Sequence, residues 1–124
     1  MGEVREVSFD LPFAPSLNRY YRHVGPRVLI SREGRKYRRM VVSRIGGLYP
    51  KFLGRLAISA EIYPPDNRKR DLDNCFIKST QDALQAAGLY EDDSQIKEIH
   101  LWMRDPIPGG LVHVTIKELN DGHD

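Results

Sequence analysis

Four segments of the chain alternate apolar and polar residues, which is the period of a β-strand with one buried face. In the third segment, Ile99, Leu101 and Met103 share one face. Residues 106–110 are rich in proline and glycine and predict a hairpin-like loop before the last strand. We predict strands over residues 6–11, 56–62, 96–104 and 111–119.

Two further segments repeat apolar residues at helical spacing. The first helix is predicted to begin after the N-cap Ser31 and to end near Leu48. The second is predicted to begin near Asp73 or Asn74 and to end at Gly88, because glycine often follows the last helical residue. The inner stripes are Tyr37, Val41, Ile45 and Leu48 in the first helix and Ile77, Thr80, Leu84 and Ala87 in the second.

The order of these elements is strand, helix, strand, helix, strand, strand. This order predicts an α/β fold in which two main helices pack on a mixed β-sheet of about four strands. The 124 residues suit a single domain over residues 1–124, with a polar tail from about residue 120. Residues 16–26 are predicted to form an irregular loop.

Composition excludes several classes of protein. The apolar runs are too short to span a membrane, and the charged N-terminus predicts no signal peptide. The single cysteine, Cys75, excludes an internal disulfide and a cysteine-cluster zinc site within one chain. No glycine-rich phosphate loop occurs, so we expect no small-molecule organic cofactor. A cytoplasmic protein is the expectation.

Charge is segregated along the chain, although its net value is only +2. Residues 19–55 hold eleven Lys or Arg and one acid, whereas residues 71–124 hold eleven Asp or Glu and four Lys or Arg. Between them lies the basic cluster Arg68-Lys69-Arg70. Arginines interleaved with tyrosines suit a polyanion such as nucleic acid. An equally open interpretation is that these basic residues only form a solvated helix face and exposed loops.

Carboxylates follow this basic cluster directly. Asp71 and Asp73 are two residues apart, so an extended backbone would point both in one direction. The second helix then leads to an acidic turn, and a returning loop is expected to bring Asp92 or Asp93 beside them. Three clustered carboxylates need a cation among them, and hard oxygen ligands suit Mg²⁺ or Mn²⁺. Such a metal would promote phosphodiester hydrolysis.

Each of these residues also has a plainer interpretation. Asp73 is placed to cap the second helix. Lys78 either neutralises charge on a scissile phosphate or is an ordinary exposed lysine. Asn74 either orients a water or phosphate or caps the helix. A calcium-binding EF-hand loop is excluded, because its sixth position would be Phe76 where glycine is required.

Five strings of residues resemble one known family, the RusA-type Holliday junction resolvases. The informative ones are RDLDN (70–74), KSTQDAL (78–84) and DDSQI (92–96). Two N-terminal strings, PSLNRYYRH (15–23) and SREGRKYR (31–38), are similar to the same family. The matches are spread in order over nearly the whole chain.

The resemblance implies a small homodimeric endonuclease, often encoded by phages or prophages, that cuts four-way DNA junctions symmetrically in recombination and repair. It implies that Mg²⁺, or Mn²⁺ in its place, binds Asp71, Asp73 and Asp93, and that Lys78 assists catalysis. We therefore expect a bacterial or phage-encoded protein associated with the nucleoid. The expected DNA contacts are Asn18, Arg19, Arg22, Arg68, Lys69, Arg70 and Asn74. A non-catalytic nucleic-acid-binding module and an inactive prophage remnant are the alternatives.

Overall fold

The computed structural model of the chain describes residues 5–119, without the side chains of Leu17 and residues 73–77. The side chains of the predicted site residues Asp73 and Asn74, and the predicted polar tail, therefore lie outside the described part. The elements follow in the order β1 (Glu6–Leu11), α1 (Leu17–Tyr20), β2 (Tyr21–Val24), β3 (Arg27–Ile30), α2 (Arg32–Ile45), β4 (Leu56–Tyr63), α3 (Leu72–Ala86), the 3₁₀-helix η1 (Asp93–Gln95), β5 (Ile96–Met103) and β6 (Leu111–Glu118).

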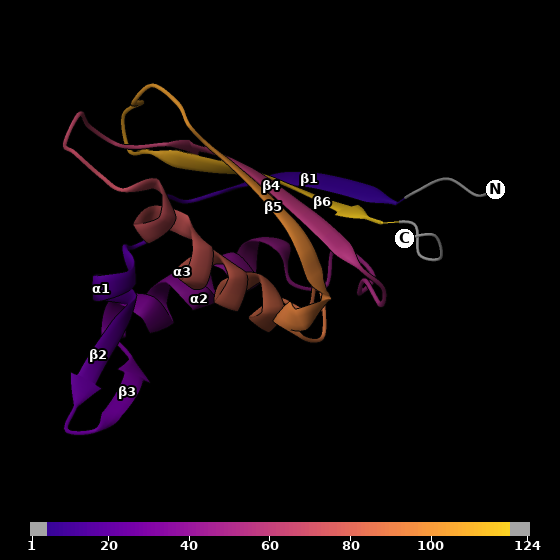
Figure 1. Cartoon of the computed structure of the whole chain (residues 1–124), viewed down its shortest axis with the longest axis horizontal. Helices are drawn as coiled ribbons and strands as arrows, with labels where there is room; N and C mark the ends of the chain where they lie inside the picture. Colours follow the sequence, from indigo (N-terminus) through magenta and orange to yellow (C-terminus); the bar gives the residue numbers. More distant parts are fainter. Residues whose placement is uncertain (1–4, 120–124) are drawn as a thin grey trace.

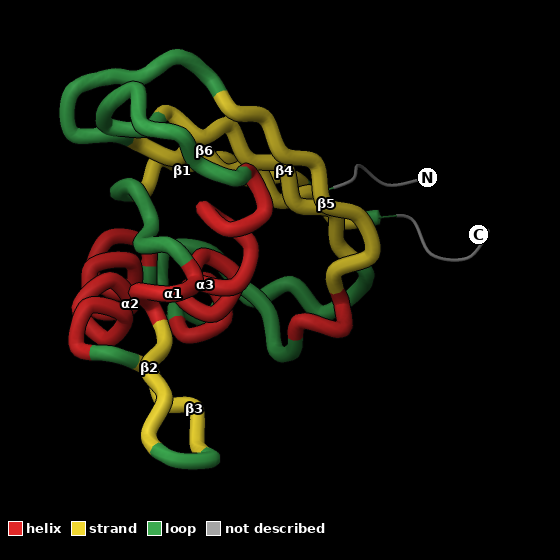
Figure 2. Tube along the Cα trace, turned by 60° about the vertical axis from the view of Figure 1, so that its left-hand side comes forward, coloured by secondary structure: helices red, strands yellow, loops and turns green. Residues whose placement is uncertain are grey.

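One mixed sheet holds four of the strands in the order β1-β6-β4-β5. Strand β6 pairs antiparallel with both β1 and β4, whereas β5 runs parallel to β4. Helices α2 and α3 cover one face of this sheet (Figures 1 and 2). The predicted α/β architecture, with four strands and two main helices, is confirmed. None of the helices within residues 5–119 is long and apolar enough to cross a bilayer.

The helices and the sheet share one core. In α2 the predicted positions Tyr37, Val41 and Ile45 are buried, and in α3 so are Thr80 and Leu84. They join a cluster of sheet residues that includes Leu11, Leu56, Ile58, Ile62, Val112, Val114 and Ile116. Burial of these stripes, rather than helix propensity, supplies most of the stability of such helices.

The boundaries of both helices differ from the predictions. Ser31 caps α2 as predicted, accepting a hydrogen bond from the Gly34 N–H at 2.9 Å. The helix ends at Ile45, however, and Leu48 is 63% exposed. Helix α3 begins at Leu72, so its N-cap is Asp71 and not Asp73. It ends at Ala86, two residues before Gly88 turns the chain with a φ of +85°.

Strand β5 lies at the edge of the sheet, which the alternating pattern did not indicate. Ile99 and Met103 are 38% and 37% exposed, because β5 has a neighbour on one side only. The loop over residues 106–110 is also not the predicted hairpin-like connection. It carries the chain past β4, since β6 lies between β1 and β4.

Residues 16–26 form regular structure, and the predicted irregular loop is wrong. Helix α1 passes directly into β2, and β2 pairs antiparallel with β3 across the two-residue turn Gly25-Pro26. The φ of +59° at Gly25 suits the first central position of such a turn, where glycine is favoured. The hairpin of residues 21–30, here called the arm, projects from the body of the molecule (Figure 1).

Candidate active site

Asp71 stands at the start of α3 with its carboxylate uncommitted. Its backbone is extended, with φ −82° and ψ 131°, and its side chain makes no capping hydrogen bond. The residue is exposed. The plainer interpretation of an aspartate here, a helix cap, therefore leaves this side chain unexplained. Its neighbour Asp73 lies outside the described side chains.

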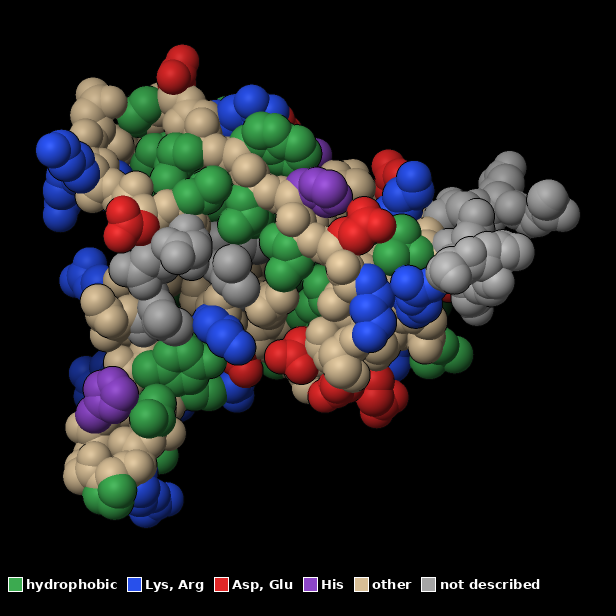
Figure 3. Space-filling view, in the orientation of Figure 1, with side chains coloured by type: hydrophobic (Ala, Val, Ile, Leu, Met, Phe, Trp, Pro, Cys, Tyr) green, Lys and Arg blue, Asp and Glu red, His purple; other side chains and the backbone are tan. Residues whose placement is uncertain are grey.

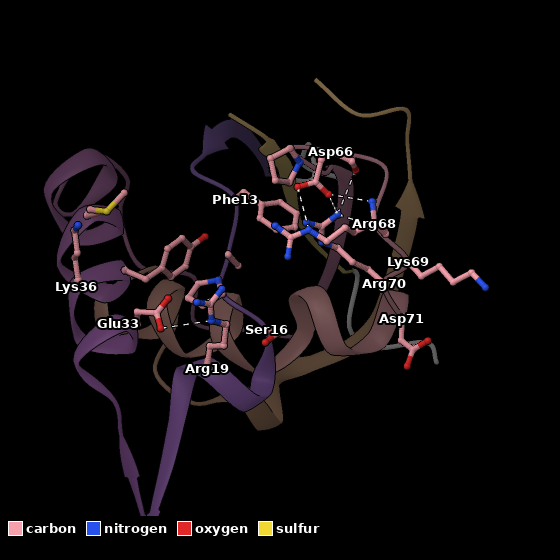
Figure 4. A pocket seen from close by; sticks show the side chains of 15 residues that line it. Phe13, Ser16, Arg19, Glu33, Lys36, Asp66, Arg68, Lys69, Arg70 and Asp71 are labelled. Atoms are coloured by element: carbon pink, nitrogen blue, oxygen red, sulfur yellow. Dashed lines mark hydrogen bonds and ion pairs between the residues drawn. The ribbon is translucent and has the colours of Figure 1, made fainter. Parts of the chain in front are cut away.

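An open hollow of about 710 Å³ lies beside Asp71. Side chains from α1, α2 and the loop before α3 surround it (Figure 4). Apolar residues, among them Phe13 and Met40, line the hollow together with charged groups that include the acids Glu33 and Asp66. Its cations are Arg19, Lys36, Arg68, Lys69 and Arg70. Such a surface suits a phosphate backbone.

Asp66 organises the basic loop that leads to Asp71. Its carboxylate pairs with Arg70 at 2.9 Å and Arg68 at 3.5 Å, and it accepts a hydrogen bond from the Arg68 N–H at 3.0 Å. The hydrogen bond from Arg70, and next the one from the Arg68 N–H, lower the pKa of Asp66 below its usual value. Arg70 also lies 5.3 Å from the centre of the Phe13 ring. These contacts fix the loop and leave Lys69 extended beside Asp71 (Figure 4).

The remaining predicted DNA contacts lie on either side of this hollow. Asn18 and Arg19 belong to α1, and both are exposed. Arg19 lines the hollow and makes an exposed ion pair with Glu33 at 3.6 Å. Arg22 lies on β2, in the arm, and is exposed. The predicted basic residues thus gather around α1 and the start of α3.

Lys78 and Asp93 line a second, smaller cavity of about 90 Å³. Tyr21, Gln81, Asp82 and Gln85 complete its lining, a set that the sequence analysis did not identify. Part of this lining could have been predicted from the sequence, because Asp82 and Gln85 follow Lys78 by four and seven residues and so share its helix face. Tyr21 belongs to the arm, and no local pattern connects it to α3.

The two adjacent acids of the turn have different roles. Asp92 is the N-cap of η1, where it accepts a hydrogen bond from the Ser94 N–H at 3.0 Å within a capping box that involves Gln95. Hydrogen bonding to Ser94 lowers the pKa of Asp92. Asp93 is exposed, and within the described part of the chain no hydrogen bond or ion pair engages its carboxylate. Of these two aspartates, Asp92 is thus engaged in a cap and Asp93 is not, within the described part of the chain.

A partly buried polar contact joins α1, α2 and α3 next to this cavity. The hydroxyl of Tyr20 and the guanidinium of Arg38 both donate to Asp82, the latter at 3.0 and 2.8 Å. Burial, and next the hydrogen bond to Asp82, raise the pKa of the Tyr20 hydroxyl above its usual value. The hydroxyl stays protonated, and the arm's base is held against α3.

The returning loop carries Asp93 back along α3 to the cavity that Lys78 lines. Asp71 precedes α3, whereas Asp93 lies against its middle, where Lys78 follows Asp71 by seven residues or about 10 Å along the helix axis. Asp71 and Asp93 line different cavities. Among the residues whose side chains are described, no three His, Cys, Asp or Glu side chains form a group that could hold a metal ion. Asp71 and Asp73, two residues apart, remain the closest pair of predicted ligands along the chain.

Comparison with known proteins gives one consistent result. Residues 11–117 match the family model described as endodeoxyribonuclease RusA. The chain is 39% identical over 120 residues to the crossover junction endodeoxyribonuclease of Enterobacteria phage HK97, covering 94% of this chain and 98% of the relative. It is 40% identical over 113 residues to that of Enterobacteria phage 82, covering 90% and 93%. It is 38% identical over 121 residues to that of Escherichia coli K12, covering 92% and 96%.

Proposed function

Since the chain belongs to the RusA family of endodeoxyribonucleases, we propose that it resolves four-way (Holliday) DNA junctions by paired, symmetric nicks during recombination and repair. The relatives come from phages and from bacteria, so we propose a bacterial or phage-encoded protein that acts in the cytoplasm at the nucleoid. We also propose that it works as a homodimer, because a two-fold dimer would match the two-fold symmetry of a junction.

One observation carries the proposal: within the described residues, an exposed carboxylate that makes no cap bond lines a hollow rich in cations. Asp71 lines the same hollow as five Lys and Arg side chains and makes no cap bond. A pure binder of phosphate gains nothing from a negative charge at this place. A hydrolase needs it, because carboxylate oxygens are the ligands that Mg²⁺ or Mn²⁺ prefers.

The donor set fits a hard divalent ion. We propose that Asp71 and Asp73 hold it at the start of α3 and that Asp93 contributes the third carboxylate. In this proposal the returning loop, which carries Asp93 back along α3 to Lys78, brings the third carboxylate to the ion. Bound there, the ion would polarise the scissile phosphate and lower the pKa of a water molecule.

The chain's own residues would position the DNA. The side chains of Arg68, Lys69 and Arg70 would hold phosphates that flank the scissile bond, with Arg19 and Asn18 on the other side of the hollow. Asn74 follows Asp73 directly and would orient a phosphate or water. Lys78 would neutralise the charge that develops on the leaving oxygen. Its place beside Asp93, rather than on an unrelated face of α3, supports this role.

The proposal is tested with a labelled synthetic four-way junction and a linear duplex of matched sequence, each incubated with Mg²⁺ and with EDTA. We expect paired nicks at symmetric positions, on the junction only and with metal only. Tight junction binding without product would instead identify a non-catalytic binding module or an inactive remnant. Equal cutting of both substrates would identify a general nuclease.

The adjacent acids Asp92 and Asp93 supply a matched pair of variants. We expect Asp93→Asn to slow junction cleavage by about 10²–10³-fold, the loss typical for removing one group that stabilises charge in the transition state. Asp92→Asn should cleave normally, because asparagine caps a helix about as well as aspartate. Single-turnover cleavage measures both. Equal losses in the two variants would contradict the assignment of Asp93.

A further inference from the structure

The tip of the arm exposes apolar side chains that no other element covers. Val24 is 44% and Val28 57% exposed, and Pro26 between them is exposed as well. In the space-filling view the arm forms a separate finger whose end carries both apolar and basic side chains (Figure 3). The fold itself gives no reason for valines here, because the tip contacts none of the core.

The register of the arm places cations beside these valines. Val24 lies opposite Arg27, and Val28 lies opposite His23. Arg22 is two residues before Val24 and so shares its face. Both arginines are exposed, and the arm carries no acid. One face of the arm therefore carries Val24 between Arg22 and Arg27, and the opposite face carries Val28 with His23. An apolar side chain between two cations is complementary to a base flanked by phosphates.

The base of the arm is fixed next to the proposed catalytic residues. Tyr20, directly before β2, is fully buried and bonded to Asp82 of α3. Tyr21, the first residue of the arm, stacks edge-on against Tyr20 and lines the cavity that contains Lys78 and Asp93. A group bound at the tip is consequently held at a fixed distance from Lys78 and Asp93. With four residues in each strand, the arm reaches about 13 Å from this cavity.

We propose that the arm recognises the branch point of a four-way DNA junction. In this proposal Val24 and Val28, on opposite faces of the ribbon, contact the two bases of an opened step at the crossover, while Arg22 and Arg27 hold phosphates on the Val24 face. A two-stranded β-ribbon is narrow enough to enter a DNA groove, and apolar wedges are a known way of opening a base step. The insertion costs least at a branch point, because base stacking is already interrupted there. The inference rests on the proposed function and adds the source of its junction specificity.

The test compares the wild-type protein with the double variant Val24→Thr/Val28→Thr, which keeps β-branched residues in both strands. The probe is a four-way junction with 2-aminopurine at the branch point, and a second junction carries it within an arm. We expect the wild-type protein to raise the fluorescence at the branch point only. The double variant should lose this rise and bind the junction about tenfold more weakly, since two valines no longer gain apolar burial. Binding to linear duplex should stay unchanged.

Val42→Thr is the matched control, because Val42 is also 38% exposed but lies on α2, away from the arm. It should behave as the wild type. Unchanged fluorescence and affinity in the double variant, together with normal cutting, would overturn the inference and leave the proposed function intact. A change in oligomeric mass without a change in fluorescence would also overturn it and would assign the tip to a second copy of the chain. Failure of the wild type to prefer junctions would refute the proposed function itself.

Discussion

Replacing Asp71 with asparagine should abolish junction cleavage while leaving junction binding intact or slightly tighter. A bound divalent ion supplies several kcal/mol of transition-state stabilisation, so the loss of one of its ligands should cost about 10³-fold or more in rate. Binding survives because the substitution removes a negative charge from a surface that contacts phosphates. Single-turnover cleavage and a binding assay in EDTA measure the two effects separately.

The fold should not be affected by this substitution. Asparagine is as good an N-cap as aspartate, and the Asp71 side chain makes no cap bond that could be lost. Asp105→Asn is the matched control, since Asp105 is exposed and lines neither of the two cavities. Its thermal midpoint and its cleavage should equal those of the wild type. Normal cutting by Asp71→Asn would remove Asp71 from the metal site.

Junction affinity should depend steeply on salt. If about six to ten phosphates are neutralised, the affinity should fall about 10³–10⁵-fold between about 50 and 200 mM salt. The five cations of the hollow and the two arginines of the arm provide contacts of this order in each chain. The Asp71→Asn protein allows the measurement with metal present and without cleavage.

Replacing a single lysine tests the salt dependence of junction affinity quantitatively. Lys69→Gln should reduce the slope of log affinity against log salt by about 0.9, the contribution of one neutralised phosphate. Lys97→Gln, on the edge strand β5 and outside both cavities, should leave the slope unchanged. A shallow response of the wild-type protein would contradict the assignment of this surface to DNA.

The sequence by itself determined the parts of the fold that repeat a hydrophobic period. Strand β4 and the stripe of Tyr37, Val41 and Ile45 were predictable because one face of each element is buried. The Ser31 cap was equally readable, since it depends on a side chain three residues from its partner. Asp71 and Lys69 could be named as candidate site residues for a related reason: they are neighbours along the chain, so their proximity needed no knowledge of tertiary structure.

Only the tertiary structure decided what depends on contacts between distant segments. The arm has no buried face at its tip, so no periodicity marked it, and the position of β6 between β1 and β4 is invisible in the strands themselves. Both acids of the turn look alike in the sequence. Asp92 is set apart by its bond to Ser94, and Asp93 by its place in the cavity with Lys78 and Tyr21. Local spacing defines elements and caps, but which face of α3 meets the arm is fixed by packing around Tyr20 and Asp82.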